Sequence, residues 1–224
     1  MSHIEAPLEF VEKYYTNDLA ERDSPEGKFA LQWAREVKGK SVLNIGCGPQ
    51  FYDDVQFFNE VPEKYVGIDV NKNNIRFLKE SNHPEVLKWR KFLKMHGVTV
   101  GLKRVSIKEK QNEFVDQFDG IYAVGVLGMF SKKETENIFG FLSSYLKKGG
   151  ILVDVDWTKP HLSEEKLRER KSYEWYSKNE LSVEEIGNIL KKNGFEIVRY
   201  GVYIVPNPKE YLWGKIYGYV GRKL

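Results

Sequence analysis

The strongest constraint on the fold is an apolar run that ends abruptly in a glycine turn. Residues 41–45 favour a strand and continue directly into the glycine turn at 46–48. A second apolar run, 65–69, ends in Asp69. Strand, glycine turn, helix, strand and acid follow one another in doubly wound α/β sheets that bind a nucleoside. We therefore expect the turn to let the backbone approach a ligand, and Asp69 to accept hydrogen bonds from ribose hydroxyls.

The glycine turn lacks the third glycine of a dinucleotide site. Gly46 and Gly48 are followed by Pro49, Gln50 and Phe51. A pyrophosphate needs close approach to the start of the helix, and a bulky Phe51 there argues against it. The sequence therefore disfavours a nicotinamide-dependent (NAD) oxidoreductase, which remains an alternative.

Length and cysteine content limit the class of protein. A chain of 224 residues can bury a large core without disulfides. The single cysteine, Cys47, excludes an internal disulfide framework, so we expect a cytoplasmic protein. No apolar run approaches the ~20 residues of a membrane span, and residues 1–5 lack the features of a signal peptide. The four histidines show no ligand spacing, so we expect no metal.

Positive charge is concentrated in one part of the chain. Residues 64–110 contain twelve lysines and arginines against four acids, although the whole chain carries a net charge of only +3. Such a local excess is typical either of a solvated helix face or of a surface that binds phosphates. A nucleic-acid partner such as RNA or tRNA therefore stays open as an alternative.

Periodicity and capping signals predict an alternating α/β order. Helices are expected over 4–19, from Pro25 to just before Gly39, over 50–59, after Asn71, over 84–96, from Ser131 and over 182–193. Strands are expected over 41–45, 65–69, 103–107 (with 98–102 as a competitor), 118–124, 151–155, 195–205 and 213–222. This order predicts a doubly wound, Rossmann-like, seven-stranded sheet that is mostly parallel, with an antiparallel C-terminal hairpin and helices on both faces. We expect one domain over 1–224, with a helical cap at 1–39, a core at 41–224 and an inserted helix at 84–96.

The order of these motifs resembles the class I S-adenosylmethionine (SAM)-dependent methyltransferases. The resemblance covers residues 41–224 and includes the glycine turn, Asp69, the strand that Phe118-Asp119 opens and the Leu-Lys-Lys-Gly-Gly segment 146–150. It implies that SAM is the cofactor, with its methionine half at the turn and its ribose at Asp69. The implied cofactor-binding residues are Asn44, Gly46, Cys47, Gly48, Tyr52, Asp69, Val70, Ile107, Val124 and Gly125. The family often has an acid after the third strand for the adenine amine, whereas Lys108 follows Ile107 here.

A second, shorter resemblance is to the small-amine N-methyltransferases that act on nicotinamide and phenylethanolamines. It rests on Tyr14-Tyr15, on the Gly-Cys-Gly-Pro turn followed by Tyr52, on Asp156 and on the ending 221–224. It implies that Tyr15 and Tyr52 line the cofactor pocket and that Asp156 faces the substrate amine. Asn44 departs from the acid commonly found two residues before the first glycine.

Polar and aromatic residues cluster after the predicted fifth strand. By strand alternation Asp154 and Asp156 share one face. Other candidates for the acceptor side are Trp157, His161, Tyr173, Trp175 and Tyr176. Carboxylates and aromatic rings together suit a cation or a planar ring, although 173–176 also fits the apolar side of a surface helix. We take Asp156, Tyr15 and His161 as the catalytic candidates.

The sequence therefore favours a SAM-dependent methyltransferase that acts on a small molecule. Methyl transfer depends mainly on placement of the nucleophile, and a general base is needed only if the nucleophile must lose a proton. Two alternatives remain. One is an RNA or tRNA methyltransferase, which the basic segment 64–110 would suit, and the other is a non-catalytic SAM-binding regulator.

Overall fold

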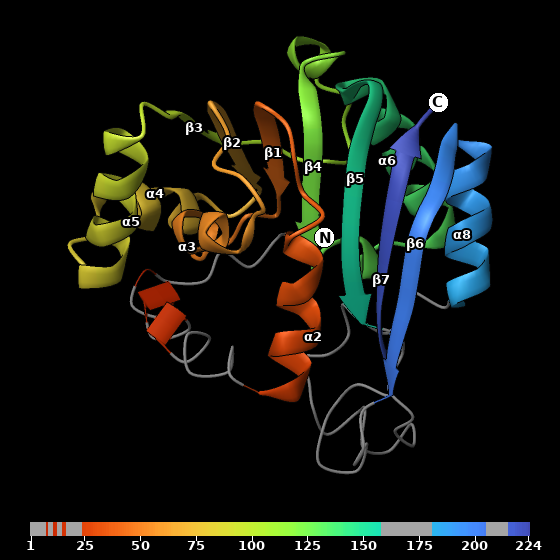
Figure 1. Cartoon of the computed structure of the whole chain (residues 1–224), viewed down its shortest axis with the longest axis horizontal. Coiled ribbons are helices and arrows are strands. Elements are labelled where there is room, and N and C mark those ends of the chain that lie inside the picture. Colours follow the sequence, from red (N-terminus) through yellow and green to blue (C-terminus); the bar gives the residue numbers. More distant parts are fainter. Residues whose placement is uncertain (1–7, 9–10, 13–14, 17–23, 158–180, 205–214) are drawn as a thin grey trace.

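A central sheet of seven strands organises the chain (Figure 1). The computed structural model describes residues 8, 11–12, 15–16, 24–157, 181–204 and 215–224, and all structural statements concern these residues. The strands are β1 (Ser41–Ile45), β2 (Lys64–Asp69), β3 (Thr99–Arg104), β4 (Phe118–Val124), β5 (Leu146–Trp157), β6 (Phe195–Ile204) and β7 (Lys215–Lys223). Their order in the sheet is β3-β2-β1-β4-β5-β7-β6. β1 to β5 pair in parallel, and β7 runs antiparallel to both β5 and β6. The predicted fold class is confirmed.

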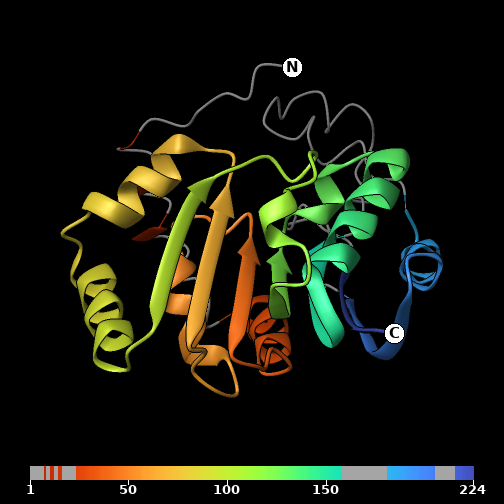
Figure 2. The same cartoon turned by 90° about the horizontal axis from the view of Figure 1, so that it is seen from above.

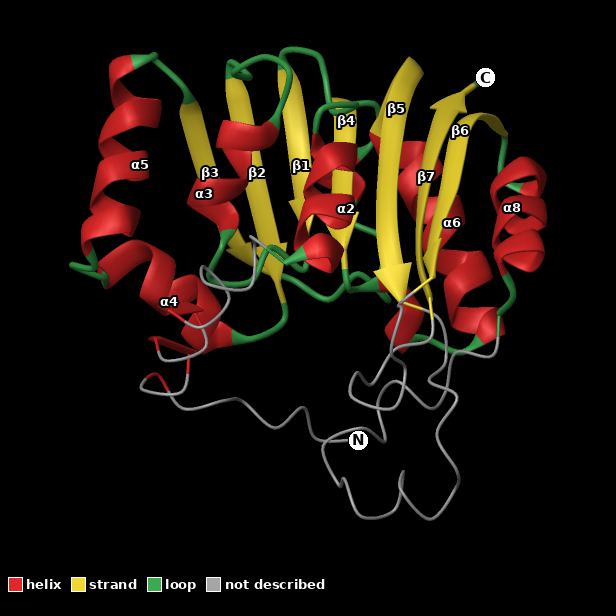
Figure 3. Ribbon diagram, turned by 60° about the horizontal axis from the view of Figure 1, so that its bottom comes forward, coloured by secondary structure: helices red, strands yellow, loops and turns green. Residues whose placement is uncertain are grey.

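Helices cover both faces of this sheet. They are α2 (Pro25–Ala34), α3 (Phe51–Asp54), α4 (Lys72–Glu80), α5 (Pro84–Met95), α6 (Lys132–Tyr145) and α8 (Val183–Lys192), with 3-10 turns η1 (Val55–Phe57), η2 (Asn112–Phe114) and η3 (Leu127–Met129). One core cluster joins side chains of α2, α3, α4 and α5 to one face, and a second joins α6 and α8 to the other. Figure 3 shows α2 and α3 on the near face and α6 behind the sheet. In Figure 2, α4 and α5 lie at the β3 edge and α8 at the opposite edge.

Several helix starts follow from local chemistry. The Ser24 hydroxyl accepts a hydrogen bond from the Gly27 backbone N–H at 3.0 Å, ahead of a proline at the first helical position. The predicted capping boxes that begin α6 and α8 are both present. The described part of the predicted helix 4–19, residues 8, 11–12 and 15–16, is helical.

Two sequence predictions need correction. The third strand is Thr99–Arg104, so the prediction of 103–107 was wrong and the competing segment was nearer. β3 is an edge strand with half-buried or exposed side chains, so it lacks the apolar alternation on which the prediction depended. The helix predicted over 50–59 is a short α3 followed by the 3-10 turn η1. Its three apolar residues, Phe51, Val55 and Phe58, are nevertheless buried.

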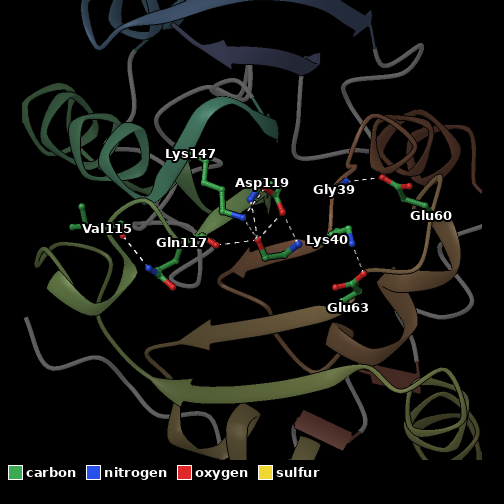
Figure 4. A network of polar contacts seen from close by, with 9 residues as sticks. Gly39, Lys40, Glu60, Glu63, Val115, Gln117, Asp119 and Lys147 are labelled. Carbon is green, nitrogen blue, oxygen red and sulfur yellow. Dashed lines mark hydrogen bonds and ion pairs between the residues drawn. The ribbon is translucent and has the colours of Figure 1, made fainter.

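A polar network ties the amino ends of the central strands together (Figure 4). Asp119 Oδ2 accepts hydrogen bonds from the Ser41 backbone N–H at 2.9 Å and the Ser41 hydroxyl at 2.7 Å. Asp119 Oδ1 forms an ion pair with Lys147 Nζ at 2.8 Å. Partial burial raises the pKa of Asp119, but the hydrogen bonds from Lys147 and Ser41 outweigh it and leave that pKa below its usual value. This network fixes β1, β4 and β5 at the end opposite their carboxyl ends.

The parallel strands bring the carboxyl ends of β1, β2, β4 and β5 to one edge of the sheet, where open α/β sheets bind ligands. In the described ranges no helix is both long and apolar enough to cross a membrane. Nor do three or more His, Cys, Asp or Glu side chains of this part of the chain gather as metal ligands would.

Candidate functional site

The glycine turn after β1 requires glycine for two separate reasons. Gly46 and Gly48 have φ angles of +57° and +51°, in the left-handed region that other residues rarely adopt. A Cβ on Gly46 would also collide with the side chain of Val126, which follows β4. The Cys47 backbone N–H donates to the Ile68 carbonyl at 3.0 Å and holds the turn against β2. The turn is thus a close-packed backbone cradle at the carboxyl edge.

Asp69 lies at the end of β2 and faces this cradle. One carboxylate oxygen, Oδ2, accepts hydrogen bonds from the Gly48 backbone N–H at 2.9 Å and the Asn74 side-chain amide at 3.0 Å. The other, Oδ1, accepts from the Asn71 backbone N–H at 2.7 Å. A carboxylate has about four acceptor positions, so Asp69 can still accept from a ligand hydroxyl. Its side chain is only 7% exposed, which favours such bonds because little competing water reaches it.

Asn74 is a site residue that the sequence analysis missed. It lies in the first turn of α4, and Asn71 begins that helix by accepting a hydrogen bond from the Asn73 backbone N–H at 2.9 Å. The first turn therefore returns toward the end of β2 and brings the Asn74 amide to Asp69. The signal in the sequence was an amide side chain three residues after a helix cap that itself follows the acid.

Asn44 holds the helix after the turn. Its side-chain amide donates to Asp54 Oδ2 and to the Tyr65 hydroxyl, both at 2.9 Å. The Tyr65 hydroxyl in turn donates to the Phe51 carbonyl at 3.0 Å. These contacts orient the turn and the start of α3. A contact between Asn44 and a ligand stays a prediction.

Phe51 does not obstruct the start of α3 as the sequence analysis assumed. Its ring is fully buried and stacks on Tyr65 with 4.1 Å between ring centroids. Gly67 in β2 makes room for it, because a Cβ there would come within 2.6 Å of the ring. Of the two features that disfavour a dinucleotide at this turn, only the missing third glycine therefore remains.

Tyr15 and Tyr52 lie among α3, α4 and α5. The Tyr15 hydroxyl donates to Asp53, and its fully buried ring contacts those of Phe77 and His83. Burial raises the pKa of Tyr52, and its ring lies 5.6 Å from the guanidinium of Arg90. The catalytic role expected of Tyr15 and the cofactor contact of Tyr52 stay predictions.

Of the remaining predicted cofactor residues, three lie directly at or after the carboxyl ends of strands, whereas Ile107 does not end a strand. Val70 directly follows Asp69, and Val124 ends β4. Gly125 has a φ of +67° and donates its N–H to the Val155 carbonyl at 2.9 Å, which joins the ends of β4 and β5. Ile107 lies in a turn beyond β3 and packs into the core on the α6 face, so it does not end a strand as expected. Its adenine contact stays a prediction.

Asp154 and Asp156 share the face of β5 that α6 and α8 cover, as strand alternation predicted. Leu152 on the same alternation belongs to the core cluster of that face, whereas Val153 and Val155 belong to the opposite one. Both aspartates are fully buried. Asp156 accepts a hydrogen bond from the backbone N–H of Gly128 in η3. Asp156 therefore joins the end of β5 to the segment that follows β4.

Other predicted acceptor-side residues cannot be placed. His161, Tyr173, Trp175 and Tyr176 lie outside the described residues, as does the side chain of Trp157. The catalytic role of His161 stays a prediction.

Much of the basic charge in 64–110 is used within the chain. Four of the basic side chains form ion pairs with acids: Arg76 with Glu80, Lys88 with Glu85, Lys103 with Glu113 and Lys108 with Glu134. Arg90 donates to the Leu78 carbonyl at 2.6 Å, and Arg104 donates to the Val70 carbonyl at 3.2 Å. At least half of the twelve basic side chains thus have partners in the chain, which weakens the expectation of a surface that binds phosphates.

Comparisons with known proteins agree with this geometry. Residues 17–200 match the profile of a protein family described as a methyltransferase domain. Comparison with curated proteins finds no match. Three solved structures illustrate the similarity of fold. A SAM-dependent methyltransferase from Mesorhizobium loti is 14% identical with a TM-score of 0.62, covering 90% of this chain and 99% of that one.

The other two contain bound ligands. A 1,6-didemethyltoxoflavin-N1-methyltransferase from Burkholderia thailandensis, with 1,6-didemethyltoxoflavin and S-adenosylhomocysteine (SAH), is 17% identical with a TM-score of 0.60. The match covers 96% of this chain and 85% of that one. A magnesium protoporphyrin IX methyltransferase from Synechocystis, with bound SAH, is 14% identical with a TM-score of 0.55 and coverages of 97% and 83%. At these identities the similarity shows a shared fold.

Proposed function

Because this chain belongs to the methyltransferase-domain family, we propose that it transfers the methyl group of SAM to a small-molecule acceptor. The fold supports this function, since the carboxyl edge of its sheet carries a glycine cradle and an acid in the order that a nucleoside requires. Two structures of the same fold contain SAH, the product that SAM leaves after methyl transfer. When bound, SAM supplies a methyl group activated by its sulfonium.

The observation that carries the proposal is the position of Asp69. Its carboxylate is nearly buried, is fastened to the glycine turn through Gly48 and still has acceptor capacity. We assign it to the ribose hydroxyls, with the Asn74 amide beside it. The residues present fit SAM, because the turn carries two glycines in the left-handed region and the nearly buried acid can accept hydrogen bonds from ribose hydroxyls.

We assign the acceptor to the ends of β4 and β5, at Asp156. This carboxylate lies in a water-excluded position, where charge interactions are stronger than in solution. Such a carboxylate favours a nitrogen nucleophile. It stabilises the positive charge that grows on a nitrogen as the nitrogen gains a methyl group, and it can take up the proton that the nitrogen then loses.

The same proposal includes the class of acceptor and the cellular compartment. Small molecules are favoured over RNA because much of the basic charge in 64–110 is paired within the chain. We place the reaction in the cytoplasm, since the chain carries a single cysteine and therefore no internal disulfide.

The function is tested by a methyl-transfer assay with SAM carrying a labelled methyl group. Panels of amines, phenols and carbon acids are offered as acceptors, with bulk tRNA as a separate arm. The proposal expects label on at least one small nitrogen compound, with a large loss for Asp69→Ala and normal transfer for Glu196→Ala, a distant exposed carboxyl on β6. Label on tRNA alone would establish the RNA alternative, and binding of SAM without any transfer would favour a regulator.

A further inference from the structure

Asp154 is a buried carboxyl group to which the described residues donate no hydrogen bond. Its side chain is fully buried, and neither carboxylate oxygen accepts a hydrogen bond from the part of the chain that the structure describes. A buried polar group without a partner destabilises the folded chain, so it calls for an explanation beyond packing. The strand position itself would suit a valine or isoleucine, because its neighbours on that face form a core cluster.

The surroundings of Asp154 link it to Asp156. The two residues lie two apart on one face of β5, which brings their side chains side by side along the strand. In the sheet register Tyr219 of β7 lies opposite Asp154, and Tyr217 lies opposite Asp156. Ala123 of β4 lies on the other side of Asp154 and leaves it little steric constraint.

The described titratable groups that act on Asp154 and on the tyrosines opposite the pair are carboxyl and phenol groups. Burial and the charge of Asp156 both raise the pKa of Asp154 well above its usual value. Burial, Asp154 and Asp156 raise the pKa of Tyr217, and burial, Asp154 and Tyr200 raise that of Tyr219 to about 12. The Tyr219 hydroxyl donates to the carbonyl of Val183, the first residue of α8. The α6 and α8 side chains in the core cluster of this face are mostly apolar.

We propose that Asp154 is a positioning residue of the acceptor site that acts through Asp156: the two carboxyl groups together hold one positively charged group of the acceptor, and Asp154 releases its proton to solvent when that group binds. This inference rests on the proposed function, in which Asp156 faces the acceptor. In the net reaction, a cation binds to the Asp154–Asp156 pair, and the proton that Asp154 carried is released to solvent. A neutral Asp154 thus avoids a second buried charge until a cation compensates for it.

The exchange of a proton for a cation has a definite pH signature. Below the pKa of Asp154, cation binding must displace a proton, so the affinity for a cation rises about tenfold per pH unit. Above that pKa the affinity becomes constant. A residue that serves only packing would not produce this dependence.

The test uses the full chain saturated with SAH and short alkylguanidinium and alkylammonium ions as probes, since both keep their charge from pH 6 to 9. Isosteric alkylureas and alcohols are the neutral controls. Calorimetry in two buffers of different ionisation enthalpy counts the protons released on binding. We expect wild-type chain to prefer the cations and to release protons on binding them, with more proton release at lower pH. Asp154→Asn and, as a second variant, Asp154→Val should bind SAH normally but bind cations without proton release and without the pH dependence.

Three results would overturn the inference. One is that the chain binds SAH but no cation of the series at any pH. Another is that cations bind without proton release in wild-type chain. The third is proton release that persists in both Asp154 variants. None of these contradicts the proposed function, whose failure would appear instead as absent SAH binding by wild-type chain or as absent methyl transfer in the assay with labelled SAM.

Discussion

The backbone N–H of Gly48 donates to Asp69 Oδ2 at 2.9 Å, and this hydrogen bond joins the glycine turn after β1 to the acid at the end of β2. Two parts of the predicted cofactor site, 21 residues apart, are therefore fixed relative to one another by the chain itself. The site is preorganised on the ends of two paired strands, which lowers the entropic cost of binding a ligand there.

Replacing Asn74 by alanine should weaken SAH binding about five- to tenfold. The substitution removes one of the hydrogen bonds that orient the Asp69 carboxylate in the free chain, so SAH must order that side chain on binding, at a cost of about 1 kcal/mol. Calorimetric titration measures the change, with Lys79→Ala at the other end of α4 as the control. Unchanged affinity in Asn74→Ala would show that this amide lies outside the cofactor site.

Replacing Gly46 by alanine should abolish most cofactor binding and lower stability. An alanine there must adopt a φ near +57°, at a cost of about 1–2 kcal/mol, and must displace Val126. Gly97→Ala is the matched control, because Gly97 has a φ of +68° with no atom within 4 Å of its added Cβ. Both variants should melt earlier than wild type, yet only Gly46→Ala should lose SAH affinity. Equal affinities would contradict the cradle.

Replacing Asp119 by alanine should destabilise the chain by about 1–3 kcal/mol and leave SAH affinity unchanged. It removes charge-assisted hydrogen bonds from Ser41 and Lys147 at the end of the sheet remote from the site. Glu63→Ala is the control, since the Lys40–Glu63 pair is exposed and should contribute little. Urea denaturation measures both.

The same carboxyl group gives a pH dependence with a definite sign. Because the folded pKa of Asp119 is lowered, its contribution is fully present above the unfolded value of about 3.9 and disappears as the pH falls through the folded pKa. As the pH is lowered, the free energy of unfolding should therefore fall more steeply in wild-type chain than in Asp119→Asn. If the free energy of unfolding fell equally with pH in both proteins, protonation of Asp119 would not contribute to the acid sensitivity of the fold.

Replacing Asp154 by asparagine should stabilise the chain at neutral and alkaline pH. The folded pKa of Asp154 is raised, so the folded chain holds its proton more tightly than the unfolded chain does. Stability from this residue is therefore greatest below about pH 3.9 and declines as the pH rises toward the folded pKa. Melting temperatures between pH 5 and 9 should fall less in Asp154→Asn, which should melt a few degrees higher at pH 8. Glu196→Gln, at an exposed carboxyl, should follow wild type.

The central strands were predictable because they are buried on both faces. β1, β2, β4 and β5 read as continuous apolar runs with glycine or acid at their ends, which is the pattern of a buried parallel sheet. β3 was misplaced because an edge strand needs no such run, and the apolar Val105 and Ile107 that attracted the prediction pack in the loop beyond it.

The candidate site was only partly predictable. Gly46, Gly48 and Asp69 could be identified because their order along the chain reflects a backbone requirement. Asn74 was missed although it follows the Asn71 cap by three residues, since its contact with Asp69 depends on how α4 leaves the end of β2. The sequence also could not show that the Asp154 oxygens accept no hydrogen bond from the described residues. A sequence indicates which face of a strand a side chain lies on, but not which polar groups surround it.

The central claim is that Asp69 and the glycine turn bind an adenosyl cofactor. Its most direct test is calorimetric titration of the purified chain with SAM and SAH, with NAD as control, repeated on Asp69→Ala and Glu196→Ala. Cofactor that co-purifies is first removed by unfolding and refolding. The account predicts binding of both adenosyl ligands to wild type and Glu196→Ala, about ten- to a thousandfold weaker binding to Asp69→Ala, and no binding of NAD. Binding of NAD alone, or equal SAH affinity in wild type and Asp69→Ala, would contradict it.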